Sequence, residues 1–212
     1  NAGIARESFF FFFFCFAGVI NPHEGIVRYS PYLGFTDVPL ARMLQEALGM
    51  SVAIENDVNT LTLTEHLFGA GRHHQNFVVV TIGRGVGMGM VLQGHLYQGA
   101  RGGAGELGHT VIDLERARRS WPDAGSLESL AADPAVRAET GLPSPEAVVQ
   151  AAEAGYIAAQ EALRRSGEYV GIALAGVINI LSPTLVIISG EGVTAGDHRL
   201  KPLLEATRRY TF

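Results

Sequence analysis

The amino-acid sequence predicts an α/β fold. Apolar runs of strand length alternate along the chain with segments whose apolar residues recur at helical spacing. The chain has 212 residues, of which 47% are hydrophobic, and this is enough for one large or two small domains with well-buried cores. No internal repeat and no block of like charges interrupts the alternation.

The first quarter of the chain predicts two strands and a helix. Phe9–Phe16 is typical of a buried strand, although its six consecutive phenylalanines are unusual because alternate residues of a strand pack on opposite faces. Ile26–Tyr29 predicts a short second strand. Thr36 or Asp37 is expected to cap a helix whose apolar stripe ends at Gly49.

The remaining elements follow the same two patterns. Strands are predicted where short apolar runs lie between turn residues, and helices where apolar or small residues form a stripe. The predicted strands are Ser51–Glu55, Phe77–Ile82, Met88–Leu92, His95–Tyr97 and Thr184–Ser189. The predicted helices are Asp57–Phe68, a segment that begins near Leu127, Pro145–Ala154, Ile157–Leu181 and His198–Arg209.

Composition and charge limit the classes of function. The net charge of −5 and the isoelectric point near 5.8 argue against a nucleic-acid-binding surface formed by this chain alone. The single cysteine, Cys15, excludes an internal disulfide and a zinc site built from several cysteines, and it fits a reducing cytoplasm. The apolar run Phe9–Ile20 is shorter than the roughly 20 residues that span a bilayer, so no membrane association is expected. The basic cluster Arg116, Arg118 and Arg119 is expected to lie in a solvated loop.

A glycine-rich turn follows the predicted strand Phe77–Ile82. Its sequence, IGRGVGMGM, matches neither the dinucleotide-binding fingerprint nor the Walker motif, and a strand-like segment follows it. Gly83, Arg84 and Gly85 can still form a turn whose backbone amides hold a phosphate. The Arg84 side chain either contributes to such a site or is simply solvated.

Glu55-Asn56-Asp57 occupies the boundary between a predicted strand and a predicted helix. Asp57 is either the N-cap of that helix or a base that draws a proton from a bound hydroxyl group. Asn56 has the donor and the acceptor needed to orient such a hydroxyl group.

A second polar cluster lies in the stretch GELGHTVIDLERARRSWPDAGSLE. Glu106 and His109 follow the flexible sequence RGGAG, and Glu128 ends the stretch. Carboxylates and a neutral imidazole can accept hydrogen bonds from several hydroxyl groups, so the cluster is either a polyol-binding site or an ordinary polar loop. Zinc would suit His109 but needs further ligands.

Four stretches of the sequence together resemble a known family. They are FAGVINPHEGIVRYSPYLGFTDVPL, IENDVNTLTLTEHLFGAG, VTIGRGVGMGMVLQGHLYQGARGGAGELGH and LSPTLVIISGEGV, in this order. They resemble the ROK family, which comprises sugar-responsive bacterial repressors, sugar kinases and related proteins. The resemblance extends from about Ala2 to Tyr210.

The resemblance implies the actin-like, RNase H-like sugar kinase fold, with two lobes around a cleft. Residues 1–58 would be part of the first, N-terminal lobe, and residues 59–212 would form the second lobe. The fold is expected to be incomplete at both ends. The N-terminal helix-turn-helix of the repressor members is expected to lie outside this chain.

The resemblance also implies roles for five residues. In kinase members the aspartate of the END motif activates the sugar hydroxyl, which corresponds to Asp57, and Asn56 would bind sugar beside it. The glutamate and histidine of the GExGH motif bind sugar hydroxyls, which corresponds to Glu106 and His109. A further sugar-binding glutamate corresponds to Glu128.

The chain departs from the family pattern at two places. The cysteines of the family's zinc loop fall on Arg119, Trp121 and Ser126, so no zinc is expected and the loop is expected to be held by ordinary packing around Trp121. In the glycine turn, Arg84 replaces the threonine that kinase members carry, and the DxGxT phosphate loop of those members is absent from this chain. Mg-ATP is therefore expected only if the protein is a kinase.

Two functions follow from the resemblance. The first is the sugar-binding effector region of a ROK transcriptional regulator, in the cytoplasm, with a sugar or sugar phosphate as ligand and operator DNA bound through the helix-turn-helix. The alternative is an ATP-dependent sugar kinase with Asp57 as its catalytic base. Either protein is expected to be a homodimer or homotetramer. The sequence does not identify the sugar, the operator or the sign of regulation.

Overall fold

The computed structural model describes residues 11–30, 32–121 and 124–212. The predicted strand Phe9–Phe16 therefore begins outside the described residues. The strands are β1 (Phe11–Phe16), β2 (Val19–Asn21), β3 (Ile26–Ser30), β4 (Phe35–Val38), β5 (Ser51–Asn56), β6 (Phe77–Ile82), β7 (Val86–Leu92), β8 (His95–Leu96) and β9 (Leu185–Ser189). The α-helices are α1 (Leu40–Leu48), α2 (Asp57–Leu67), α3 (Leu114–Ser120), α4 (Leu127–Ala131), α5 (Asp133–Thr140), α6 (Pro145–Glu153), α7 (Ile157–Leu181) and α8 (Asp197–Tyr210). Short 3-10 helices are η2 (Ala70–His73), η3 (Leu107–His109) and η4 (Glu191–Ala195).

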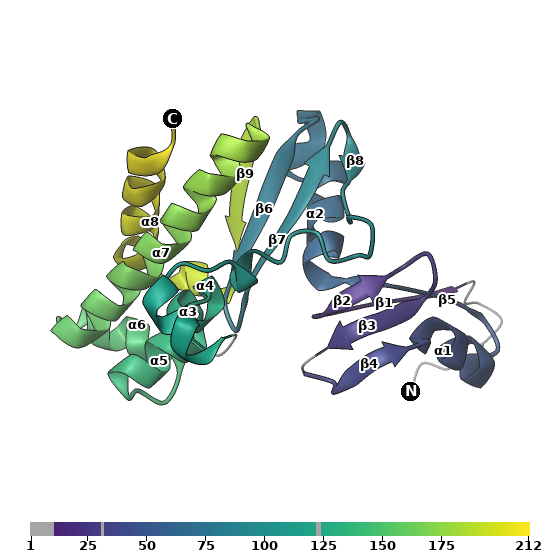
Figure 1. Cartoon of the computed structure of the whole chain (residues 1–212), viewed down its shortest axis with the longest axis horizontal. Helices are drawn as coiled ribbons and strands as arrows, with labels where there is room; N and C mark the ends of the chain where they lie inside the picture. Colours follow the sequence, from purple (N-terminus) through teal and green to yellow (C-terminus); the bar gives the residue numbers. More distant parts are fainter. Residues whose placement is uncertain (1–10, 31, 122–123) are drawn as a thin grey trace, which may run out of the picture.

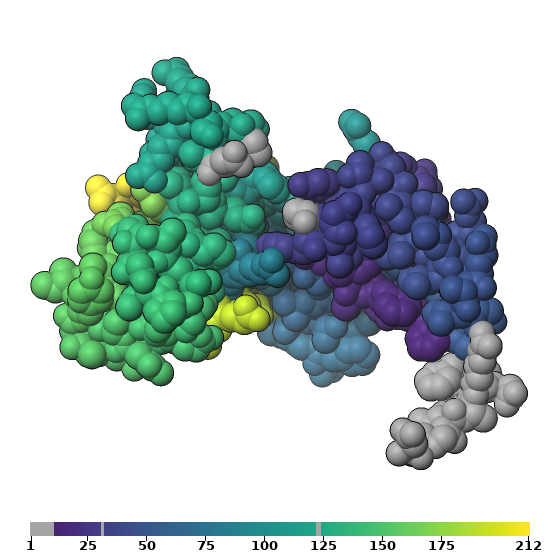
Figure 2. Space-filling model, turned by 90° about the horizontal axis from the view of Figure 1, so that it is seen from below, coloured from purple at the N-terminus to yellow at the C-terminus, as the bar shows by residue number. Residues whose placement is uncertain are grey.

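The elements divide into two groups in space (Figure 1). We refer to residues 11–56 as the N-terminal part and to residues 57–212 as the C-terminal part. The N-terminal part holds β1–β5 and α1, whereas α2 lies beside β6 and β7 of the C-terminal part. The two parts meet near the middle of the molecule in the space-filling view (Figure 2). The lobe boundary near residue 58 remains a prediction.

The N-terminal part contains two small sheets. β1 pairs with β5 in parallel, and β2, β3 and β4 form an antiparallel sheet. Ile20, Val27 and Ile54 are almost fully buried between these sheets and α1. Phe12 and Phe16 of β1 pack against this core, while Phe11, Phe13 and Phe14 are exposed. The phenylalanine run therefore forms a strand, but only part of it is buried.

The C-terminal part is organised around β6, which is buried along most of its length. The sheet has the order β8-β7-β6-β9, with β6 antiparallel to β7 and parallel to β9. Successive residues of a strand point to opposite faces. Val78 and Val80 accordingly contribute to the core that includes Leu174 of α7, whereas Phe77 and Val79 pack with Leu61 of α2 on the other face. Helices cover both faces of β6, which explains its continuous apolar sequence.

α7 and α8 lie side by side on one face of this sheet (Figure 1). The predicted small-residue face of α7 is confirmed, since Ala162, Ser166, Gly167 and Gly171 are buried along it. Small side chains let two helix backbones approach closely, which suits this pair. No helix in the described part of the chain is long and apolar enough to cross a membrane.

Several sequence predictions match the structure closely, and others are wrong. The bounds of β6 and α7 are those predicted. Thr36 and Asp37 do not cap α1, because both belong to β4 and the helix begins after Pro39. The arginines Arg116, Arg118 and Arg119 lie in α3 rather than in a loop; Asp113 caps this helix by accepting a hydrogen bond from the Arg116 amide, 3.0 Å. β9 is only partly buried, because it lies at an edge of its sheet.

Candidate functional site

The first group of site residues lies where β5 leads into α2. Asn56 is the N-cap of α2: its Oδ1 accepts a hydrogen bond from the Asn59 amide, and its Nδ2 donates one to the Gly18 carbonyl, both at 3.0 Å. Asp57 is the first residue of the helix and is exposed, and its Oδ1 accepts a hydrogen bond from the Val58 amide at 2.9 Å. The interpretation of Asp57 as the N-cap is therefore wrong. The other carboxylate oxygen of Asp57 accepts no hydrogen bond from a described residue, so it is free for a ligand.

Glu55 supports this junction from inside the protein. It is buried, with 6% of its surface exposed. Its carboxylate accepts hydrogen bonds from the Asn56 amide at 2.8 Å, from Asn59 Nδ2 at 3.1 Å, and from the side-chain amide of Gln98. Because Gln98 belongs to the segment before Glu106, Glu55 connects the start of α2 to the second group of site residues.

The second group lies in the segment around η3. Glu106 precedes η3 and His109 ends it, and 3.7 Å separates Glu106 Oε2 from His109 Nε2. The segment before Glu106 is held in place, since the Met88 amide donates to the Gly105 carbonyl at 3.0 Å and the Ala104 amide donates to the Gln98 carbonyl at 3.1 Å. The structure thus shows a glycine-rich loop fixed to β7.

Charged residues of both groups influence the pKa of Glu106. Burial raises the pKa of Glu106 above its ordinary value, and the nearby carboxylates of Glu128 and Asp57 raise it further, while His109 opposes them. A charge shifts a neighbouring pKa strongly only over a short range. Glu128 Oε2 also lies 3.1 Å from the position of a Cβ on Gly108, next to His109, and Asp57 acts on the Glu106 carboxyl from the start of α2. We refer to Asp57, Glu106, His109 and Glu128 as the polar cluster.

Glu128 links this cluster to the glycine turn. It lies in the first turn of α4, and its Oε2 accepts a hydrogen bond from the Val86 amide at 3.0 Å. A Cβ atom on Gly85 would lie 2.6 Å from this oxygen, and one on Gly108 would lie 3.1 Å from it. A side chain on Gly85 would therefore displace the Glu128 carboxylate from its present position, and one on Gly108 would crowd it.

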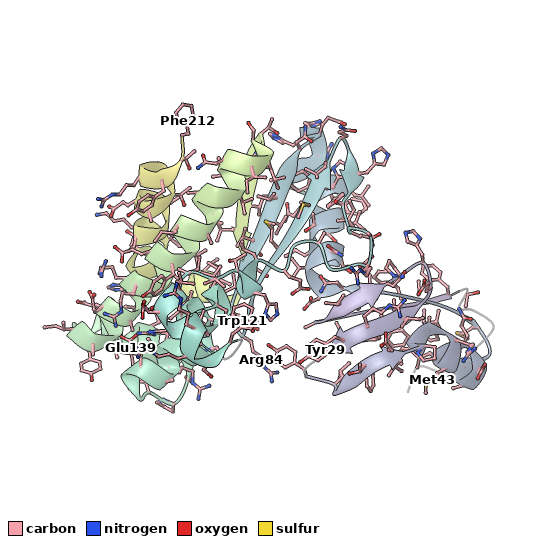
Figure 3. The ribbon with its side chains drawn as sticks, in the orientation of Figure 1. Tyr29, Met43, Arg84, Trp121, Glu139 and Phe212 are labelled. Atoms are coloured by element: carbon pink, nitrogen blue, oxygen red, sulfur yellow. The ribbon has the colours of Figure 1, made fainter. Side chains whose placement is uncertain are left out.

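The glycine turn itself is poorly suited to a nucleotide phosphate. The Gly83 amide donates to the Gly85 carbonyl at 3.0 Å, and the Val86 amide is used by Glu128. The Glu191 carboxylate lies beside the turn, 3.4 Å from the position of a Cβ on Gly83. A negative charge beside the turn opposes a bound phosphate. Arg84 is exposed at the tip of the turn and points toward the N-terminal part (Figure 3).

The loop that corresponds to the family's zinc loop is held by backbone pairing. Val111 and Ser126 form an antiparallel bridge, the Ile112 amide donates to the Gly125 carbonyl, and the Leu127 amide donates to the Thr110 carbonyl. The side chain of Ser126 accepts from the Ser129 amide at 3.2 Å and so caps α4. Trp121 is 50% exposed, so the predicted packing around this residue is wrong.

The donors in this loop do not suit a structural zinc ion. Ser126 and Trp121 offer no thiolate, and Arg119 is a cation. No cluster of three or more His, Cys, Asp or Glu residues in the described part of the chain has a geometry that could hold a metal ion.

Two contacts near the site were not predicted. The hydrogen bond between Glu55 and the side-chain amide of Gln98 joins residues that lie 43 positions apart in the sequence. Tyr32, in the loop between β3 and β4, lies under the guanidinium group of Arg84, with 3.9 Å between Arg84 Cζ and the ring centroid. The local sequence gives no signal for either contact, because each joins distant segments.

The family model for the ROK family matches residues 5–212. The chain is 32% identical over 178 residues to the xylose repressor of Bacillus subtilis, covering 82% of this chain and 46% of that protein. A crystal structure of a ROK family transcriptional regulator, a homologue of the Escherichia coli MLC protein, superposes with a TM-score of 0.83 at 29% identity, over 94% of this chain and 54% of that one. The ROK hexokinase of Thermus thermophilus superposes with a TM-score of 0.80 at 31% identity, over 92% of this chain and 67% of that one.

These likenesses agree with the arrangement of the elements and with the order of the sequence motifs. The chain spans about half the length of the Bacillus subtilis repressor that it matches. The predicted actin-like fold is confirmed by the superposition on both a regulator and a kinase. On these grounds, the chain belongs to the ROK family.

Proposed function

We propose that this chain is the sugar-binding effector region of a ROK transcriptional regulator. The observation that carries the proposal is that Asp57, Glu106 and His109 offer exposed hydrogen-bonding groups, while the carboxylates of Glu128 and Glu191 lie against the glycine turn, where they disfavour phosphate. The Val86 amide and the space beside Gly83 are taken by Glu128 and Glu191.

The chemistry of the cluster suits a neutral polyol. Ionised carboxylates accept hydrogen bonds from hydroxyl groups, and a neutral imidazole can accept one and donate one. Asp57 in a regulator acts as an acceptor that binds the sugar and transfers no proton. Asn56 retains one N–H and one lone pair beyond the bonds that cap α2, so it can add a contact to the same ligand.

The named relatives support the regulator. Two of them are transcriptional regulators, and the name of the Bacillus subtilis relative makes xylose the first sugar to test. We further propose that the regulator binds operator DNA through a helix-turn-helix outside residues 1–212, that it acts in the cytoplasm, and that it assembles as a homodimer or homotetramer. Binding of the sugar between the N-terminal and C-terminal parts would alter how the DNA-binding segments are oriented.

An ATP-dependent sugar kinase is the second candidate. Asp57 supports it, because this residue has a free carboxylate oxygen at the helix N-terminus and could act as the base for a sugar hydroxyl. Phosphoryl transfer depends on positioning the phosphates and stabilising their charge. The position of Glu191 beside the glycine turn weighs against this function.

A melting experiment separates the two candidates. The protein is heated with D-xylose and with a panel of aldoses, ketoses, amino sugars and sugar phosphates, each with and without Mg-ATP. A ligand at about 100 times its Kd adds roughly 2.7 kcal/mol to the free energy of unfolding, so Tm rises measurably. We expect a rise with one sugar that Mg-ATP does not change, and loss of that rise in Asp57→Ala and His109→Ala.

Two other results would contradict the proposal. Formation of a sugar phosphate and ADP, measured with a coupled assay, would establish the kinase. The absence of a Tm rise with every sugar, in protein whose circular dichroism shows the expected helix content, would exclude both functions. Glu46→Ala, on the exposed face of α1, serves as the matched control that should bind sugar normally.

A further inference from the structure

A contact between the two parts of the molecule lies at the edge of the sugar site. Tyr32 belongs to the β3–β4 loop of the N-terminal part, and Arg84 belongs to the β6–β7 turn of the C-terminal part. The guanidinium carbon of Arg84 lies over the Tyr32 ring, 3.9 Å from its centroid. Figure 3 shows Arg84 between the two parts. The contact is therefore made only when the two parts are close together.

The ring of Tyr32 borders the cluster of site carboxylates. Burial raises the pKa of the Tyr32 phenol, and the charges of Glu128 and Asp57 raise it further while Arg84 lowers it. The phenol oxygen also lies 3.8 Å from the position of a Cβ on Gly85. Tyr32 thus covers the glycine turn from the N-terminal side and lies near Glu128, whose Oε2 is 2.6 Å from the same Cβ position.

Arg84 has no competing partner that would explain its position. It forms no ion pair with any residue that the structure describes, although Asp57, Glu106 and Glu128 are all in this region. A guanidinium group is attracted to the face of an aromatic ring, and the attraction grows when water is excluded. A sugar bound beside the pair would exclude water from it.

We propose that Tyr32 and Arg84 form a clasp that holds the N-terminal and C-terminal parts closed around the ligand. The two residues are positioning residues: they set how long the site stays closed and leave the hydrogen bonds to the sugar to the polar cluster. The identity of the ligand rests on the proposed function, but the clasp is a property of the protein without ligand. The two ideas can therefore be tested separately.

The sequence supplies the probes for this test. It contains one tryptophan, Trp121, and one cysteine, Cys15. Trp121 is half-exposed in the C-terminal part, and Cys15 is exposed on β1 of the N-terminal part. A thiol-reactive fluorophore on Cys15 that accepts energy from Trp121 reports the separation of the two parts without any added substitution.

Four variants are compared with the unchanged protein: Tyr32→Leu, Tyr32→Phe, Arg84→Gln and the double variant Tyr32→Leu/Arg84→Gln. We expect energy transfer in the ligand-free protein to fall in Tyr32→Leu and Arg84→Gln, and to be retained in Tyr32→Phe because the ring remains. The dissociation rate of the bound sugar should rise about two- to fivefold in the first two variants. The double variant should resemble either single variant, because both remove the same contact.

Unchanged energy transfer in both Tyr32→Leu and Arg84→Gln would overturn the clasp, as would additive effects in the double variant. If the unchanged protein binds none of the sugars, the proposed function fails, while the energy transfer of the ligand-free variants still decides whether the clasp exists. Both side chains are substantially exposed, so the variants should stay folded, which a Tm close to that of the unchanged protein confirms.

Discussion

The carboxylate of Glu128 accepts a hydrogen bond from the backbone amide of Val86, with 3.0 Å between Glu128 Oε2 and the amide nitrogen. This bond fixes the first turn of α4 to the start of β7. It also places an internal anion against the glycine turn, where a phosphate group would otherwise be attracted. One residue thus belongs to the proposed sugar cluster and also places a carboxylate against the glycine turn.

The space around Glu128 leads to the first prediction. In Gly85→Ala, the new Cβ would lie 2.6 Å from Glu128 Oε2, so the carboxylate must move away from the Val86 amide. We expect a loss of about 1–2 kcal/mol in the free energy of unfolding and at least a tenfold weaker sugar affinity. Denaturant unfolding and isothermal titration measure the two effects. The matched control is Gly176→Ala in α7, where a Cβ meets nothing within 4 Å. This substitution should raise the free energy of unfolding by roughly 0.5–1 kcal/mol, because alanine favours the helix more than glycine does. Normal sugar affinity in Gly85→Ala would show that the position of Glu128 is irrelevant to binding.

Removing the buried carboxylate of Glu55 should destabilise the whole site. Glu55→Ala leaves the Asn56 amide, Asn59 Nδ2 and the Gln98 side chain without their acceptor. Loss of buried hydrogen bonds to a charged group should lower the free energy of unfolding by about 3 kcal/mol, measured with urea. Glu46→Ala removes an exposed carboxylate 3.9 Å from Arg42 and should change the free energy of unfolding by less than about 0.5 kcal/mol. Equal effects of the two substitutions would contradict this role for Glu55.

The elements that the sequence predicted best are those with a strong local pattern. β6 is a short apolar run between polar turns, and α7 combines a long periodic stripe with small residues, so their bounds were predicted correctly. β2 and β4 are short and become strands only by pairing with β3, which no local pattern reveals. α3 was also not predicted. Its three arginines are typical of a solvent-exposed segment, and because no residue of this helix is buried, its sequence has no apolar stripe that would indicate a helix.

The site shows the same division. The residue types of Asp57, Glu106 and His109 were compatible with hydroxyl recognition, and the resemblance to the ROK family added Glu128. Sugar binding by these four residues stays a prediction, while their proximity in the fold is seen only in the structure. The contact between Tyr32 and Arg84 joins residues that are far apart in the chain and belong to different parts of the molecule. Sequence spacing carries no information about such a contact, since it depends on how the two parts approach each other.

The raised pKa of Glu106 predicts a stability that depends on pH. A carboxyl whose pKa is higher in the folded than in the unfolded protein favours folding while it is protonated, and this contribution is lost as the pH rises through the raised pKa. Glu106→Gln should therefore be slightly more stable than the unchanged protein at pH 7, by roughly a few tenths of a kcal/mol, because the side chain is 42% exposed and screened by solvent. The difference should disappear at pH values below the ordinary pKa of a glutamate, while sugar binding should be lost at pH 7.

Urea unfolding at several pH values measures this effect. Glu115→Gln is the control, because the Glu115 side chain is 75% exposed on α3. A Glu106→Gln variant that is less stable than the unchanged protein at pH 7 would contradict the unfavourable burial of this charge.

The last prediction concerns the buried ion pair of Arg199 and Asp133. It contacts the glycine turn through the backbone amide of Asp133. Arg199 Nη2 lies 2.8 Å from Asp133 Oδ1, Arg199 Nη1 donates to the Gly192 carbonyl at 3.0 Å, and the Asp133 amide donates to the Gly83 carbonyl at 2.8 Å. The side chains are 1% and 7% exposed. Arg199→Met leaves the Asp133 charge buried without its partner and should cost about 3–5 kcal/mol. The double variant Arg199→Met/Asp133→Leu should recover a large part of this loss, because it removes both buried charges.

A double-mutant cycle in urea measures the coupling between the two residues, which we expect to be about 2 kcal/mol or more. The exposed pair Arg42 and Glu46, with both side chains 72% exposed, gives the reference cycle and should show less than about 0.5 kcal/mol. Because Asp133 also binds Gly83, Arg199→Met should weaken sugar affinity even at temperatures where the variant is fully folded. Additive effects of the two substitutions would mean that the side chains of Arg199 and Asp133 act independently, and would contradict the proposed support of the glycine turn by their ion pair.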